Sequence, residues 1–165
     1  MKPHTFREQP IASDIKSIAS ILSTSGFFNV EEQEVGVSLV RERLEQGERC
    51  EYFFQFAELE DSVRGYTCFG PIPGTKSSYD LYWIAVDTTY RGQGLGTSLL
   101  RQTEQEIGKR GGTRIYIETS SSNLYVPTRS FYERNAYHLE AELKDYYAPD
   151  DNKLIYVKAS SWPLS

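Results

Sequence analysis

Apolar residues recur at helical spacing in two segments near the beginning of the chain. The first segment is marked by apolar residues three or four positions apart, followed by a glycine of the kind that often ends helices: Ile11, Ile15, Ile18, Leu22 and Gly26. A second helix is expected after Asn29, because asparagine is a favoured N-terminal capping residue. Its apolar positions and its end are Val30, Val37, Val40, Leu44 and Gly47.

After residue 47 the pattern changes to that of strands. Residues 50–58 are rich in aromatic side chains, and residues 63–69 follow a polar turn at Glu60 and Asp61, so the two segments predict a hairpin. The loop that follows contains Pro71, Pro73 and Gly74. Residues 79–86 are almost continuously apolar, which indicates a central, buried strand.

The rest of the chain returns to alternating helices and strands. A helical face is formed by Leu95, Leu99, Thr103 and Ile107, and Gly111 and Gly112 close it. Strands are predicted at 4–8, 114–119, 137–146 and 153–158, and a short helix at 127–135. The resulting order, β-α-α-β-β-β-α-β-α-β-β, predicts an α/β (α+β) fold with a mixed sheet and helices on both faces.

A glycine-rich turn separates the predicted central strand from the helix after it. Glycine lets the backbone approach a ligand closely, and a helix N-terminus offers unpaired N–H groups to an anion. An arginine at the head of the turn adds a planar donor for phosphate. The turn is therefore interpreted as a phosphate site made by Arg91, Gly92, Gln93, Gly94, Leu95, Gly96 and Thr97.

Two common phosphate motifs do not fit this turn. A nucleotide P-loop requires lysine after its glycines, whereas Gly96 is followed by Thr97 and Ser98. A dinucleotide fingerprint requires glycine at its sixth position, and counting from Gly92 that position is Thr97. A nucleotide-binding enzyme is therefore disfavoured.

The Arg-x-x-Gly-x-Gly spacing at Arg91, Gly94 and Gly96 resembles the GCN5-related N-acetyltransferase (GNAT) superfamily, and the resemblance extends over residues 79–158. It implies a mostly antiparallel central sheet whose fourth and fifth strands splay apart. It also implies that the turn holds the pyrophosphate of acetyl-CoA. By this resemblance the strand before the turn has a bulge, and the pantetheine arm pairs with Ile84, Ala85 and Val86.

Residues 128–137 resemble a second segment of the same family and carry the predicted proton donor, Tyr132. Ala136 stands where the family has glycine, which predicts a turn that is less strained or follows another path. The leading general base is Glu118, and Asp80 is its competitor; either carboxylate is alternatively a solvated charge. Asn123 is expected at the cofactor from the spacing found in N-terminal acetyltransferases of bacterial ribosomal proteins.

Composition and net charge restrict the partners and cofactors that the chain is expected to bind. The formal charge of −5 argues against nucleic-acid partners and mildly favours amine substrates. Cys50 and Cys68 are too few for a disulfide framework or a zinc site, so buried reduced thiols and no metal are expected. No apolar run approaches the roughly 20 residues of a bilayer crossing. We expect one cytoplasmic domain, 1–165, without membrane partners, in which 160–165 form a loose tail.

Two functions remain in view. The first is an N-acetyltransferase that transfers the acetyl group of acetyl-CoA to a small-molecule amine or to a peptide or protein amine. The second is a non-catalytic acyl-CoA-binding sensor or scaffold. Both require the turn at Arg91, whereas catalysis also requires Tyr132 and a carboxylate. The acceptor, the acyl-chain length and the oligomeric state cannot be read from the sequence, which is compatible with a homodimer.

Overall fold

The computed structural model of the chain describes residues 3–159. Its elements, in chain order, are β1 (Thr5–Arg7), α1 (Asp14–Thr24), α2 (Val30–Gln46), β2 (Phe53–Leu59), β3 (Ser62–Pro71), β4 (Ser78–Val86), α3 (Leu95–Lys109), β5 (Arg114–Ser120), α4 (Val126–Arg134), β6 (His138–Ala148) and β7 (Asp151–Ala159). Three short 3₁₀ turns lie at Gly47–Arg49 (η1), Thr88–Tyr90 (η2) and Asn123–Tyr125 (η3). The predicted order of helices and strands is confirmed. The predicted tail at 160–165 lies outside the described residues.

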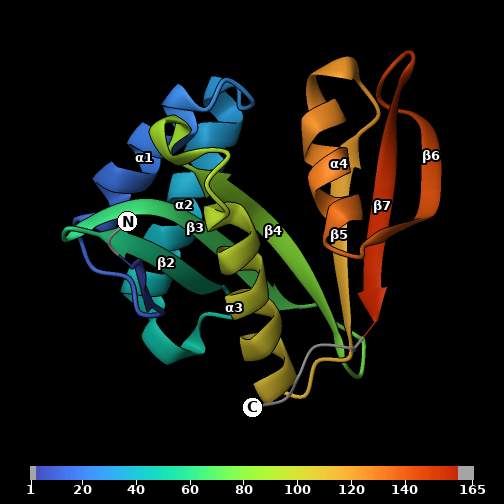
Figure 1. Ribbon diagram of the computed structural model, residues 1–165. Helices are drawn as coiled ribbons and strands as arrows, with labels where there is room; N and C mark the ends of the chain where they lie inside the picture. The colour runs from blue at the N-terminus through green and yellow to red at the C-terminus, as the bar shows by residue number, and fades with distance from the viewer. Residues whose placement is uncertain (1–2, 160–165) are drawn as a thin grey trace.

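One seven-stranded sheet forms the centre of the molecule, in the order β1-β2-β3-β4-β5-β7-β6. Neighbouring strands are antiparallel except β4 and β5, which are parallel. These two strands pair only from Ser78↔Arg114 to Asp80↔Tyr116. Beyond these pairs they diverge, as the green and orange strands of Figure 1 show. The mixed, mostly antiparallel sheet with splayed strands 4 and 5 is therefore confirmed.

The strand β4 contains an irregularity on the side of β3. Leu81 pairs with Phe69 and Trp83 pairs with Cys68, so Tyr82 is an extra residue between two successive pairs. An extra residue of this kind bends a strand and increases its local twist. The bulge expected in this strand is present, and it lies where β4 leaves β5.

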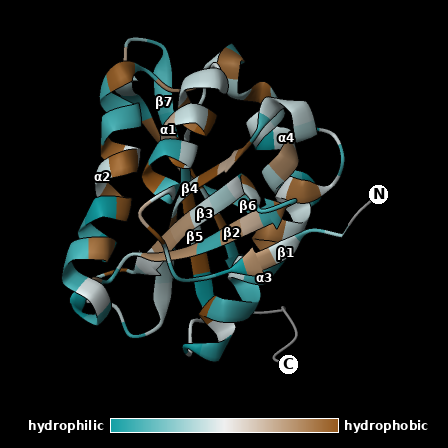
Figure 2. Ribbon diagram, turned by 90° about the vertical axis from the view of Figure 1, so that its left-hand side faces the viewer, coloured by the Kyte–Doolittle hydropathy of each residue, from teal (hydrophilic) through white to brown (hydrophobic). Residues whose placement is uncertain are grey.

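The helices cover the two faces of the sheet in pairs, with α1 and α2 on one side and α3 and α4 on the other (Figure 2). Ile18, Leu22 and Val40 pack from the first pair against aromatic residues of β2 and β3. Leu100 and Ile107 of α3 pack with residues of β5 on the opposite face. Burial of these side chains supplies the main driving force for the layered arrangement.

Three of the apolar positions that mark the predicted helices do not face the core. The first helix begins at Asp14, and Ile11 is 51% exposed. Its N–H donates instead to the Asp14 carboxylate, which is buried and paired with Arg7 at 2.8 Å. In α2, Val30 and Leu44 lie at the solvent-facing ends, 69% and 37% exposed. By contrast, the prediction that both cysteines are buried free thiols is confirmed.

The turn from α4 into β6 is strained, contrary to the sequence-based expectation. Ala136 has a φ of 68°, in the left-handed region that an L-residue with a Cβ adopts at a cost. Alanine thus takes a conformation suited to glycine instead of redirecting the turn. The Ala136 N–H still donates to the Glu133 carbonyl at 3.1 Å, and Tyr137 N–H to Tyr132 at 3.0 Å.

Replacing Ala136 by glycine is expected to stabilise the protein. Removal of the Cβ relieves roughly 1–2 kcal/mol of backbone strain, and the greater freedom of glycine in the unfolded chain offsets roughly 0.5–1 kcal/mol of this gain. Urea unfolding should therefore give a higher midpoint for Ala136→Gly with an unchanged slope. A lower urea midpoint for Ala136→Gly than for the unmodified protein would contradict the interpretation that the backbone at Ala136 is strained.

Among residues 3–159 no helix is both long enough and apolar enough to cross a bilayer. The same residues include no group of three or more His, Cys, Asp or Glu side chains placed to hold a metal ion.

Candidate active site

A cleft of about 860 Å³ lies where β4 and β5 have separated. Its walls come from the α1–α2 connection, the second half of β4, the glycine-rich turn with the first residues of α3, and the end of β5. The helix α4 and the β6–β7 hairpin complete it. Because these segments are distant in the sequence, the splay of the sheet and not a single motif creates the cleft.

The free edge of β4 forms one wall. Ile84, Ala85 and Val86 all line the cleft. Beyond Asp80 the strand pairs with β3 on one side only, so the backbone groups on its other edge have no strand partner. Unpaired backbone groups of this kind can bind an extended amide-containing ligand as a neighbouring strand would.

The glycine-rich turn opens directly onto the cleft. Gly92 and Gly94 have φ values of 74° and 83°, and Gly94 is the N-cap of α3. The first residues of the helix, Leu95, Gly96 and Thr97, line the cleft. Their N–H groups precede the first intrahelical bond, which runs from Ser98 N–H to the Gly94 carbonyl at 3.0 Å. Unpaired N–H groups and the positive end of the helix dipole therefore favour an anion here.

Arg91 connects this turn to the opposite face of the sheet. Its guanidinium donates to the Ser25 carbonyl at 3.1 Å and lies 5.1 Å from the centre of the Phe27 ring. The side chain remains exposed and lines the cleft. Only part of its donor capacity is used, because guanidinium has five N–H groups. The remaining donors can contact a phosphate.

Tyr132 is a buried tyrosine that lines the cleft. Its side chain is 5% exposed and packs among the rings of Phe131, Tyr137 and Tyr156. Within residues 3–159 the hydroxyl has no hydrogen-bond partner, although it lines the cleft. Burial raises the pKa of Tyr132 well above its ordinary value, which keeps the phenol protonated. The hydroxyl therefore stays protonated at physiological pH.

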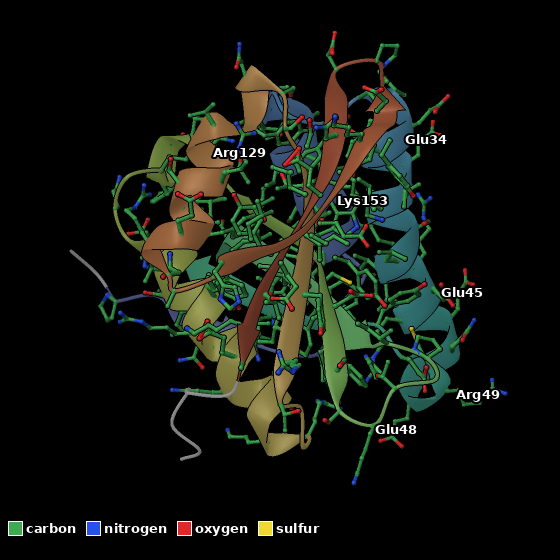
Figure 3. The ribbon with its side chains drawn as sticks, turned by 90° about the vertical axis from the view of Figure 1, so that its right-hand side faces the viewer. Glu34, Glu45, Glu48, Arg49, Arg129 and Lys153 are labelled. Carbon is green, nitrogen blue, oxygen red and sulfur yellow. The ribbon has the colours of Figure 1, made fainter. Side chains whose placement is uncertain are left out.

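The two candidate bases occupy different positions at the splay. Glu118 lines the cleft, and its carboxylate forms an ion pair at 2.9 Å with Lys153, which extends from β7 (Figure 3). Asp80 belongs to the last residue pair between β4 and β5 and is not among the residues that line the cleft. Burial and then the nearby Glu118 charge raise the pKa of Asp80 to about 6, and Lys153 lowers it.

Two further predicted residues lie outside the cleft lining. Gln93 is exposed, and its side chain donates to the Thr89 carbonyl at 3.3 Å. Asn123 is exposed at the start of the 3₁₀ turn η3. The cofactor roles assigned to them remain predictions.

Sequence reasoning missed the segment that ties the two strand ends together. Phe27, in the α1–α2 connection, accepts a hydrogen bond from the Tyr125 hydroxyl at 3.0 Å, and the two rings are 5.9 Å apart. With the contact between Arg91 and Ser25, the α1–α2 connection thus reaches both the residues after β4 and those after β5. We call residues 25–28 the bridging segment. Partners separated by 66 and 98 positions leave no local signal in the sequence.

Comparison with known proteins agrees with this geometry. The sequence model of the Acetyltransferase (GNAT) family matches residues 15–137. A crystal structure from Desulfovibrio desulfuricans, assigned to the GNAT family of acetyltransferases, is 40% identical with a TM-score of 0.94, and the match covers 95% of this chain and 99% of that one. The PaiA N-acetyltransferase of Thermoplasma acidophilum, solved with coenzyme A, has a TM-score of 0.73 at 17% identity, covering 96% and 99% of the two chains, which shows the fold alone.

A curated relative matches over a shorter stretch. The ribosomal protein bS18-alanine N-acetyltransferase of Escherichia coli is 33% identical over 73 residues, which are 44% of this chain and 48% of the relative. The match therefore spans about half the length of that enzyme.

The splayed sheet and the glycine-rich turn, together with these comparisons, are those of the acetyltransferase class, whose co-substrate is acetyl-CoA. The chain belongs to the Acetyltransferase (GNAT) family.

Proposed function

We propose that this protein transfers the acetyl group of acetyl-CoA to a primary amine by direct attack of the amine on the thioester. The observation that carries the proposal is the cleft itself, which brings an anion-binding helix N-terminus, a free strand edge and a protonated tyrosine together. No covalent enzyme intermediate is required. In the part of the chain that the structure describes, both cysteines are buried, which supports direct transfer.

The residues present fit acetyl-CoA from its phosphates to its thioester. The N–H groups of Leu95, Gly96 and Thr97 would bind the pyrophosphate, assisted by the free donors of Arg91. The edge of β4 would pair with the amides of the pantetheine arm. This order places the thioester deeper in the cleft, towards Tyr132.

Starting from an alkyl ammonium, the reaction requires two protons to leave the nitrogen and one to reach the departing sulfur. An alkyl ammonium with a pKa near 10 cannot attack until it is deprotonated. Attack then forms the C–N bond, and a β4 backbone N–H at the free edge would stabilise the oxyanion. The C–S bond breaks as the Tyr132 hydroxyl gives its proton to the thiolate. Glu118 is the proposed base for the first proton, acting through water, and that proton leaves with solvent. The second proton, released from the nitrogen as the tetrahedral intermediate collapses, restores the Tyr132 hydroxyl.

Asp80 is the alternative base, and the pH profile distinguishes it from Glu118. A carboxylate serves as a base only when ionised, so a base with the pKa of Asp80, about 6, loses activity as the pH falls through 6. If Glu118 is the base, Glu118→Gln should lower kcat about 100-fold or more, and Asp80→Asn should leave kcat within a few-fold. If instead Asp80→Asn lowers kcat about 100-fold or more and abolishes the fall in activity near pH 6, while Glu118→Gln changes kcat only a few-fold, the base is Asp80.

Two measurements test the function as a whole. Calorimetric titration should give saturable binding of acetyl-CoA, and thiol release with a panel of primary amines should give turnover with at least one of them. A non-catalytic acyl-CoA-binding module would bind but release no thiol with any amine. Absence of binding at millimolar acetyl-CoA would refute both functions.

A further inference from the structure

Charged residues are divided unevenly across the cleft. Its basic lining residues, Arg91 and Arg134, come from the turn before α3 and from the end of α4, on one face of the sheet. Its acidic lining residues are Glu32, Glu118 and Asp151, from α2, β5 and β7. The basic side suits the phosphates of acetyl-CoA. The acidic side is where the second substrate has to enter.

The acidic residues Glu32, Glu118 and Asp151 line one cleft and form a series in which neighbours share a nearby tyrosine. Glu32 and Asp151 both lie close enough to Tyr125 to raise its pKa, after the larger effect of burial. Glu118 and Asp151 act in the same way on Tyr147, which also lines the cleft. Negative charge thus extends from the end of β5, across the start of β7, to the first turn of α2.

The cations close to this series leave it with an excess of negative charge. Lys153 is paired with Glu118 at 2.9 Å. Arg129 donates to the carbonyls of Ser120 and Ser122 and is not among the residues that line the cleft. Figure 3 shows that these two side chains extend from different elements, β7 and α4. Asp80, behind Glu118, adds a further carboxylate.

The acidic side of the cleft already holds one ammonium group, which belongs to a lysine of the protein itself. The Lys153 ammonium contacts the Glu118 carboxylate and lies 4.5 Å from the centre of the Tyr146 ring. Aromatic side chains that attract cations also line the cleft beside the carboxylates: Phe28, Tyr82, Trp83 and Tyr147. In the same cleft lies Tyr132, a residue that is 5% exposed and whose hydroxyl has no hydrogen-bond partner among the described residues. The cleft therefore combines the proposed proton donor with a recognition surface for positive charge.

The bridging segment limits how far an acceptor can extend. The bond between Tyr125 and Phe27 and the contact of Arg91 with Ser25 link the α1–α2 connection to the residues that follow β5 and β4. A long chain cannot pass through this link without breaking these contacts. A compact acceptor fits better than a polypeptide.

We infer that the acceptor is a small aliphatic diamine or polyamine, whose reacting amine lies near Glu118 and whose second ammonium is bound by Glu32 and Asp151. This inference rests on the proposed function and adds the substrate class. A second charge in the acceptor is recognised by a charge-assisted hydrogen bond, which is lost when the acceptor has only one amine.

Acceptors of equal length test the inference. With saturating acetyl-CoA, kcat/KM for 1,4-diaminobutane should exceed that for 1-aminobutane roughly tenfold, more than the factor of about two from its second equivalent amine. An acceptor with a terminal carboxylate, 4-aminobutanoate, should be the poorest. Equal values for the first two amines, or better turnover of an unblocked basic peptide, would overturn the inference.

Single charge-removing variants show which carboxylates bind the second ammonium group of the acceptor. Glu32→Gln keeps the capping bond, because a glutamine oxygen can still accept from the Asn29 N–H, 2.8 Å from the Glu32 carboxylate. It should remove most of the preference for the diamine by raising KM. Asp151→Asn should act similarly. Glu31→Gln changes the net charge equally in the same helical turn but does not line the cleft, so it should keep the preference.

The two proposals fail in different ways. If acetyl-CoA binds and no amine is acetylated, the proposed function is wrong. Calorimetric titration of 1,4-diaminobutane into the coenzyme A complex still tests the inference, because binding that weakens in Glu32→Gln supports it. Binding no tighter than that of 1-aminobutane contradicts it.

Discussion

Tyr132→Phe is expected to lower kcat about 100-fold or more, the usual contribution of a positioned general acid. The substitution removes only the hydroxyl and leaves the ring among Phe131, Tyr137 and Tyr156. Without the hydroxyl, the departing thiolate of coenzyme A loses its proposed proton donor. Affinity for acetyl-CoA should remain within a few-fold, as measured by calorimetry, because the phosphate contacts lie at the start of α3.

A neighbouring tyrosine supplies the control. The Tyr156 hydroxyl donates to the Glu133 carboxylate at 3.1 Å, and Tyr156 is not among the residues that line the cleft. Tyr156→Phe should therefore leave kcat unchanged, although it removes the same atom from an adjacent ring. Normal turnover in Tyr132→Phe would exclude the donor role. A large loss in both variants would indicate a structural effect.

Gly94→Leu should weaken acetyl-CoA binding by about 100-fold or more, as expected when several charge-assisted hydrogen bonds are lost together. A Cβ at Gly94 meets no atom within 4 Å in the protein, so the new side chain would occupy the space in front of the helix N-terminus. The φ of 83° adds roughly 1–2 kcal/mol of strain. Calorimetry gives the affinity, and thermal unfolding shows whether the fold is retained.

A substitution at Gly74 is the control that separates the loss of acetyl-CoA affinity from the effect of backbone strain on stability. It has a φ of 79°, its Cβ would also meet nothing within 4 Å, and it lies in the loop between β3 and β4, away from the cleft lining. Gly74→Leu should lower stability about as much as Gly94→Leu while leaving acetyl-CoA affinity intact. Equal affinity in the two variants would contradict the phosphate-binding role of the turn.

Local patterns in the sequence predicted the elements but not every direction in which they face. The spacing of Ile15, Ile18 and Leu22 identified α1 correctly. Ile11 has the same spacing but lies outside the helix, because the buried contact between Arg7 and Asp14 fixes where the first turn begins. Hydrophobic periodicity contains no information about such an ion pair.

The same distinction applies to the site. The glycine-rich turn is contiguous, so its residues could be recognised together, and most of them line the cleft. The contacts of Phe27 with Tyr125 and of Arg91 with Ser25 join residues that only the completed fold brings together. The uneven charge of the cleft was equally hidden, because Glu32 and Asp151 look like ordinary surface acids in the sequence. Long-range contacts therefore determine the acceptor side, whereas a local motif determines the phosphate side.

The short pairing between β4 and β5 has a mechanical consequence. Only the pairs from Ser78↔Arg114 to Asp80↔Tyr116 join the two parts of the sheet, while each part is held internally by long antiparallel ladders. The sheet therefore consists of two antiparallel parts that are joined by a short parallel junction between β4 and β5. A small rotation at this short junction would change the width of the cleft without breaking a ladder, and the contact that it would have to break is the Tyr125–Phe27 bond of the bridging segment.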